Sequence, residues 1–305
     1  MGITCFVFSC FFTIARIHII QRDNYRKNVV YTKMNAIKNK LQLNATTIKI
    51  IAIVLMVLDH IHQMWALSGA PIWLTWLGRP VFPIFLFAMS ESFHYTRNSK
   101  SFLKRLLFAS WIMTICSTVL QIALPNEDVV LMNNAFMTFF VTGLYILFYE
   151  MFASGVKEKK AGKIVKSILL CFVPVLTSIP ALLLSVPHEN EIFAPEILRV
   201  IITVCLLLPN LLFLEGGFTL VILGVLFYAL RKWRWAQISA LAAFSALSFI
   251  SSGVGLEQPN QWLMILAVIP MLLYNGEKGH GMKHFFYIFY PAHIYLLYII
   301  STLLK

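Results

Sequence analysis

The chain has 305 residues, of which 59% are hydrophobic and 12% are charged. Soluble domains carry about 25% charged residues, so this composition excludes an ordinary soluble protein and indicates an integral membrane protein. Basic residues outnumber acidic residues by 25 to 13. They lie in short loops between apolar runs, which is the positive-inside pattern of membrane proteins, so we expect a lipid-bilayer partner and no nucleic-acid partner.

Residues 1–42 are predicted to be an N-terminal extension or an extra helix. The apolar run from Gly2 to Ile14 could anchor the chain, or the natural start could be Met34, with everything before it an extension of the gene. The stretch from Arg16 to Lys33 has no amphipathic pattern, which favours the second interpretation. Residues 43–305 are predicted to form a single transmembrane domain.

Apolar runs of roughly 20 residues, long enough to cross a hydrocarbon core, recur from Leu43 onward. Because a spanning segment must satisfy its own backbone hydrogen bonds, we predict an all-α polytopic transmembrane helix bundle of about nine to ten spans. The segment at 197–214 is predicted to be re-entrant or interfacial, because Pro209 and Asn210 interrupt it. The remaining spans are predicted at residues 48–67, 71–93, 102–124, 135–153, 164–186, 217–230, 236–250, 262–274 and 284–304.

Ionisable side chains within these spans are candidate functional groups, because a charge is seldom placed in lipid without a partner or a role. At a rise of about 1.5 Å per residue, Asp59 and His60 of the first span reach nearly the same depth as Arg79 of the second. Tyr290 and His293 lie three residues apart on one stripe of the last span. Asp59 and Arg79 could instead form a structural ion pair. The segment Glu215-Gly216-Gly217 is interpreted as a turn before a span.

A histidine beside a carboxylate can act as a general base, and a guanidinium or a tyrosine hydroxyl can stabilise a developing oxyanion. Proton-coupled transport uses the same residue types in the same places. Walker and Rossmann motifs are absent from the sequence, which argues against chemistry driven by ATP or linked to NAD. The five cysteines lie in apolar runs without metal-ligand spacing, so no metal site is expected.

Three ordered motifs in these spans resemble the TraX family, which is named for a membrane protein that acetylates the amino terminus of conjugative pilin. The motifs are Leu58-Asp59-His60, the segment from Gly78 to Phe85 that continues through Glu91 and Arg97, and the closing stretch from Tyr274 to His293. The resemblance runs from about Leu43 to the C-terminus. The family is similar, more distantly, to multispan membrane acyltransferases that use cytoplasmic acyl-CoA.

The resemblance implies that residues 43–305 form an acyltransferase-like domain. Such a domain would move an acetyl group from cytoplasmic acetyl-CoA to an amine or hydroxyl, on a pilin-like peptide N-terminus or on an envelope glycan or lipid. The expected location is a bacterial cytoplasmic membrane. His60 is expected to act as the base, Asp59 as its orienting partner, Arg79 as an electrostatic stabiliser, and His293 or Tyr290 as a second polar contributor.

Acetyl-CoA, as a polyanion, is expected to bind at the basic cytoplasmic loops. The residues assigned to it are Arg97, Lys104, Arg105 and Asn275. Two alternatives stay open beside acetyl transfer. One is a proton-coupled permease in which Asp59, His60 and His293 form a relay, and the other is a structural or assembly factor whose polar cluster only locks helices together.

Overall fold

The computed structural model describes residues 42–185, 195–252 and 260–304. The predicted N-terminal extension and the acidic loop around residues 188–191 therefore lie outside the described residues, except for Gln42. The described residues contain helices and one isolated β-bridge, which joins Leu43 to Tyr274. In chain order the helices are α2 (Ala45–Trp65), α3 (Trp73–Gly78), α4 (Val81–His94), α5 (Ser99–Ala123), α6 (Ala135–Lys157), α7 (Ala161–Cys171), α8 (Val173–Leu176), α9 (Ile179–Ser185), α10 (Pro195–Leu206), α11 (Gly217–Ala229), α12 (Arg234–Ser252), the 3-10 helix η1 (Gln261–Ala267), α13 (Val268–Leu273) and α14 (Lys283–Leu303).

The chain is a multi-pass membrane protein with an all-α fold, as predicted. In the described part of the chain, five helical segments are long and apolar enough to cross a bilayer, and three further apolar helices are shorter. Several of the about nine to ten predicted spans consist of broken or short helices in these residues. The five long segments are Ala45–Trp65, Ser99–Ala123, Ala135–Lys157, Ala161–Leu184 and His284–Leu303.

The predicted span at 71–93 is broken into α3 and α4 at Gly78-Arg79-Pro80. Proline has no N–H group to continue a helical hydrogen-bond ladder, so a helix interior cannot pass through Pro80 without disruption. The region 197–214 is interrupted as predicted: α10 ends at Leu206, and the chain through Pro209 and Asn210 is not helical.

Small residues allow the helices to approach one another closely. A Cβ atom added to Gly224 of α11 would lie 2.6 Å from Thr142 Cγ2 of α6, and one added to Gly143 of α6 would lie 2.4 Å from Leu103 Cδ2 of α5. Contacts of this kind replace the hydrophobic driving force that helices lack in lipid.

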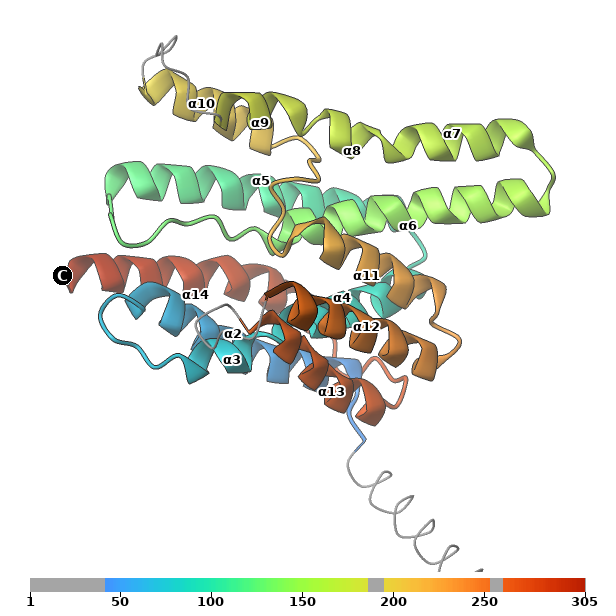
Figure 1. Ribbon diagram of the computed structural model, residues 1–305, viewed down its shortest axis with the longest axis horizontal. Helices are drawn as coiled ribbons and strands as arrows, with labels where there is room; N and C mark the ends of the chain where they lie inside the picture. The colour runs from blue at the N-terminus through green and yellow to red at the C-terminus, as the bar shows by residue number, and fades with distance from the viewer. Residues whose placement is uncertain (1–41, 186–194, 253–259, 305) are drawn as a thin grey trace, which may run out of the picture.

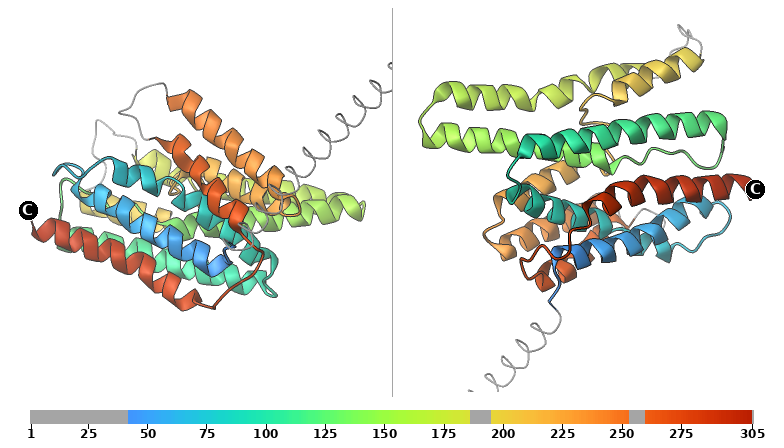
Figure 2. Two further views of the ribbon diagram at one scale, coloured as in Figure 1. Left: turned by 90° about the horizontal axis from the view of Figure 1, so that it is seen from below. Right: turned by 180° about the vertical axis from the view of Figure 1, so that it is seen from behind.

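The helices run side by side with alternating direction, so the connections gather at two ends of the bundle (Figure 1, Figure 2). The α4–α5, α6–α7 and α11–α12 connections lie at the right of Figure 1, whereas the α5–α6 connection and the C-terminus lie at the left. The right-hand connections contain basic residues, and by the positive-inside rule we assign this end to the cytoplasm. These residues include Arg97, Lys100, Lys157, Lys159, Lys160, Arg231 and Lys232.

Candidate functional site

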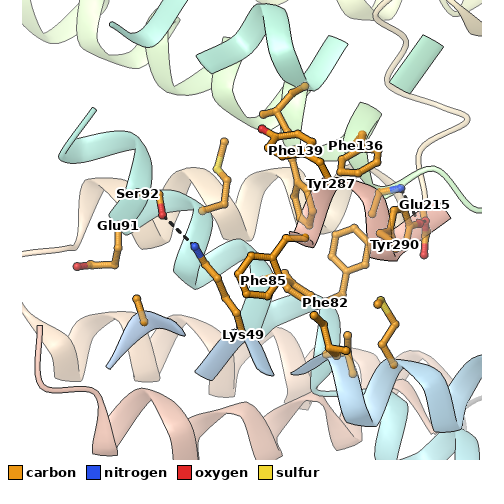
Figure 3. A pocket seen from close by; sticks show the side chains of 18 of the residues that line it. Lys49, Phe82, Phe85, Glu91, Ser92, Phe136, Phe139, Glu215, Tyr287 and Tyr290 are labelled. Atoms are coloured by element: carbon orange, nitrogen blue, oxygen red, sulfur yellow. Dashed lines mark hydrogen bonds between the residues drawn. The ribbon is translucent and has the colours of Figure 1, made fainter. Parts of the chain in front are cut away.

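A cavity of about 750 Å³ lies inside the bundle, between α2, α4, α6 and α14. This volume is within the range of small-molecule and cofactor sites. Figure 3 shows Lys49, Glu91 and Ser92 at one end of it, Glu215 and Tyr290 at the other, and aromatic rings between them. The residues of the inner polar end are Asp59, His60, Arg79, Glu215, Gln261 and Tyr290, and the aromatic wall contains Phe82, Phe85, Phe136, Phe139, Phe286 and Phe289.

His60 and His293 form a buried histidine pair at the inner polar end. Nδ1 of His60 lies 2.7 Å from Nε2 of His293. Nδ1 of His293 lies 2.8 Å from the backbone oxygen of Phe289, which can only accept a hydrogen bond. For neutral rings, His293 therefore donates from Nδ1 and accepts at Nε2, and His60 donates from Nδ1. The lone pair of His60 is left on Nε2, and the His60 side chain lines the cavity.

Asp59 and Arg79 meet through Thr75. Nη2 of Arg79 donates a short hydrogen bond to the Thr75 hydroxyl, and the Thr75 side chain also faces the Asp59 carboxyl. Among the described residues, the ion pairs at contact distance involve Glu158, so Asp59 and Arg79 interact without direct contact. Asp59 also packs against Gly78, where an added Cβ would lie 2.2 Å from Asp59 Cγ. The ring partner of His60 is thus His293, whereas the Asp59 carboxyl contacts Thr75.

Arg79 lines the cavity, and its guanidinium group is only partly hydrogen-bonded. Its Nη1 donates to Gln261 Oε1 at 3.2 Å. Its Nε is buried and has no hydrogen-bond partner among the described residues. A buried N–H group without a partner is rare in a folded chain, so the Arg79 guanidinium has unused hydrogen-bonding capacity beside the cavity.

Glu215 belongs to the site, although its sequence context indicated only a turn. The turn exists, because Gly216 and Gly217 adopt positive φ values of 77° and 71°. The Glu215 side chain lines the cavity, and its Oε2 accepts a 2.7 Å hydrogen bond from the Tyr290 hydroxyl. That hydroxyl in turn accepts from the backbone N–H of Ala135 at 3.0 Å. The signal for Glu215 in the sequence is that it is an acidic residue between two apolar runs.

The other end of the cavity is basic. Lys49, Arg105 and Lys278 line it, and Nζ of Lys49 lies 3.4 Å from the Ser92 hydroxyl and 5.7 Å from the centre of the Phe286 ring. Lys49 stands near the N-terminus of α2, where the helix dipole disfavours a cation, so a bound anion would stabilise it.

Of the four residues predicted to bind acetyl-CoA, Arg105 lines the cavity. Arg97 and Lys104 are exposed and lie outside the lining. Asn275 also lies outside the lining, and its backbone N–H donates to the Leu43 oxygen at 3.0 Å. This bond holds the loop that carries Lys278 against the start of α2.

Comparisons with known proteins match most of the chain. The family model described as "TraX protein" matches residues 44–301. The chain is 27% identical over 272 residues to a protein of Dichelobacter nodosus named "Probable fimbrial assembly protein FimC, serogroup H1", and the match covers 84% of this chain and 95% of that protein. No solved structure matches the chain.

Proposed function

Because the chain belongs to the TraX family, we propose that this multi-pass bacterial membrane protein transfers an acetyl group from cytoplasmic acetyl-CoA to the amino terminus of a pilin-like peptide. The observation that carries the proposal is the histidine pair at the inner end of a cavity whose other end is basic. The fimbrial assembly name of the Dichelobacter nodosus relative supports a pilus subunit as the acceptor.

The length of the cavity suits the donor. Lys49 and His60 both lie on α2, 11 residues apart, which is about 17 Å at roughly 1.5 Å per residue. The pantetheine arm of CoA has about 13 bonds between its diphosphate and its sulfur, or about 15 Å at the advance per bond of an extended chain. With the diphosphate at Lys49 and Lys278, the thioester would therefore lie beside His60.

The residues at the inner end supply general-base catalysis. Nε2 of His60 takes the proton from the attacking nitrogen, and Nε2 of His293 stabilises the charged ring through the hydrogen bond from His60 Nδ1. The guanidinium group of Arg79, which lines the cavity, donates to the oxyanion that forms on the thioester carbonyl. Collapse of the tetrahedral intermediate breaks the C–S bond, and His60 returns its proton to the departing sulfur, giving an amide and CoA.

The test uses the full chain reconstituted in liposomes, with release of the CoA thiol and the mass of a synthetic peptide as readouts. His60→Ala is expected to lower kcat/KM by about 10²-fold or more, the usual contribution of a general base. His94→Ala is the matched control, because His94 is exposed at the end of α4 and does not line the cavity. Full acetyl transfer by His60→Ala would refute the proposal. Substrate-dependent proton flux without CoA release would establish a permease instead.

A further inference from the structure

Glu215, like Asp59, is a proton-accepting carboxylate at the inner polar end of the cavity. It comes from the segment between α10 and α11, whereas His60 comes from α2. One helix positions both groups, because α14 holds Glu215 through Tyr290 and His60 through His293. Tyr290 and His293 are neighbours on α14, with ring centres 6.1 Å apart. An acceptor beside His60 would therefore also lie near Glu215.

The charges around the two carboxylates of the inner polar end, Asp59 and Glu215, differ. Asp59 is faced by the Thr75 side chain and has Arg79 and His62 as electrostatic neighbours. Glu215 is faced by the Tyr290 hydroxyl of α14, the side chain of Asn133, the backbone of Asn134, and the second carboxylate, Asp59 of α2. Among the described residues no cation forms an ion pair with it. A positively charged group that entered the inner polar end would therefore form an ion pair with Glu215 in preference to Asp59.

Acetylation of a protonated amine requires its nitrogen to lose two protons. Two proton-accepting side chains at the site can therefore each take one of them. A peptide α-amine has a pKa of about 8, so near neutral pH it is largely an ammonium ion without a lone pair. The first proton must leave before the nitrogen attacks, and the second leaves the nitrogen after the C–N bond has formed. The departing sulfur takes one proton and water finally takes the other. A hydroxyl acceptor, by contrast, releases a single proton.

We propose that Glu215 binds the ammonium group of the acceptor and removes its first proton, so that His60 acts on a neutral amine. This inference rests on the proposed acetyl transfer and assigns the first proton step to a separate residue. Glu215 is then a catalytic residue, because its carboxylate touches the reacting nitrogen. His60 and Arg79, which line the same cavity, act on the second proton and on the oxyanion.

The experiment compares two acceptors in liposomes that contain the full chain. One peptide carries an ordinary α-amine, and the other begins with a 4-aminobenzoyl group, whose aromatic amine is already neutral at pH 7. Glu215→Gln keeps an oxygen that accepts from Tyr290 and removes the carboxylate. It is expected to lose about 10²-fold with the α-amine peptide at pH 7 and little with the aromatic amine. The α-amine loss should shrink as the pH rises above about 8.

Glu150→Gln is the matched control. Glu150 accepts a short hydrogen bond from the Tyr228 hydroxyl, as Glu215 does from Tyr290, yet it does not line the cavity. Replacement of Glu150 should leave the acetylation rates of both peptides unchanged at every pH. If Glu215→Gln does not accumulate in membranes, Glu215→Asp replaces it, and the shifted carboxylate must lower the α-amine rate more than the aromatic-amine rate.

The outcomes separate the two proposals. An equal loss with both acceptors at all pH values would give Glu215 a structural role and overturn the inference, and so would unchanged activity. A wild-type protein that acetylates neither peptide would instead refute the proposed acetyl transfer. If Glu215→Gln loses activity with the α-amine peptide alone, and the loss depends on pH, the result supports both the acetyl transfer and the role of Glu215.

Discussion

At the scale of single residues, one backbone carbonyl determines the proton positions of the histidine pair. The Phe289 oxygen accepts a hydrogen bond from the Nδ1–H group of His293, so Nε2 of His293 must accept a hydrogen bond from His60. His293 itself is buried and does not line the cavity. In the proposed mechanism it is thus a positioning residue, which fixes the tautomer of His60 from outside the cavity.

Replacing His293 tests this positioning role. His293→Ala removes the acceptor of the His60 Nδ1–H and leaves both tautomers of His60 accessible. We expect kcat to fall by about 10²-fold with little change in KM for acetyl-CoA, because the proposed donor contacts are at the other end of the cavity. Steady-state kinetics of CoA release would measure both constants. A rise in KM at unchanged kcat would contradict the assignment.

Sequence indicates which residues are candidates more readily than it indicates their partners. Ionisable groups inside apolar runs stand out, which is why His60, Asp59 and Arg79 could be named in advance, and the structure places all three on one cavity. The His60–His293 bond joins positions 233 residues apart, and no local pattern encodes such a pair. Glu215 was missed because the glycines that follow it indicate a turn whether or not a carboxylate points inward.

At the scale of elements, the break between α3 and α4 lets α3 pack directly on α2. Gly78 is the contact point, since an added Cβ would lie 2.2 Å from Cγ and 2.3 Å from Cβ of Asp59. The Cβ atom of Asp59 is fixed by the α2 backbone, so a rotamer change cannot relieve its part of the clash. α2 or α3 would have to move, and Asp59 and Arg79 would move with them.

Gly78→Ala is therefore expected to lower stability by about 1–3 kcal/mol, the typical effect of overpacking. It should also reduce acetyl transfer, because Thr75 and Arg79 share the displaced segment. Gly162→Ala is the control, since its added Cβ would meet nothing within 4 Å. Thermal unfolding in detergent and CoA release measure the two effects. Equal melting temperatures for the two variants would show that the packing at Gly78 tolerates a methyl group.

The turn between α6 and α7 gives a prediction of pH dependence. Glu158 contacts Lys160 and Lys163, each at 2.8 Å, and hydrogen bonds from these lysines lower the pKa of its carboxyl from 4.5 to about 2. A lowered folded-state pKa stabilises the protein above the unfolded pKa, and the stabilisation is lost as the pH falls from about 4.5 toward about 2.

We expect wild type to melt slightly higher than Glu158→Gln at neutral pH, with the difference fading below pH 4.5. The difference should be small and should shrink in high salt, because these side chains are exposed. Melting curves across pH and ionic strength would measure it. A difference that persists toward pH 2 would show that Glu158 acts through something other than its charge.

The helical class and most span positions were predictable, because apolar runs of membrane length are unambiguous. The breaks were predictable only in part. Pro209 and Asn210 signalled the end of α10, and the chain is irregular there. Gly78-Arg79-Pro80 also marks a break, but hydropathy stays high through it, so one long span was predicted at 71–93. Where a helix ends inside an apolar run depends on packing against neighbours that hydropathy does not describe.

At the scale of the whole molecule, the cavity connects the basic end of the bundle to the histidine pair. α2 carries Lys49 at one end and His60 at the other, so a single helix fixes their separation. The loop that carries Lys278 is pinned to the start of α2, because Ala45 N–H donates to the Glu277 oxygen at 2.8 Å and the Thr46 hydroxyl donates to the His280 oxygen at 2.6 Å. The loop at the basic end of the cavity is thereby fixed to the start of α2.

This arrangement predicts that the donor enters from the cytoplasmic side alone. Acetyl-CoA does not cross membranes, so it should be consumed by inside-out vesicles and spared by right-side-out vesicles that contain the same amount of protein. Equal consumption by both would contradict the assigned orientation.

The same arrangement predicts which lysine matters for the donor. Lys49→Gln is expected to raise KM for acetyl-CoA about tenfold, which corresponds to about 1.4 kcal/mol, with little change in kcat because the reacting atoms lie about 17 Å away. Lys104→Gln is the control, since Lys104 is exposed on α5 and lies outside the cavity lining. Kinetics on inside-out vesicles would measure both variants. An equal rise in KM for the two would mean that diffuse surface charge attracts the donor, and Lys49 would lose its specific role.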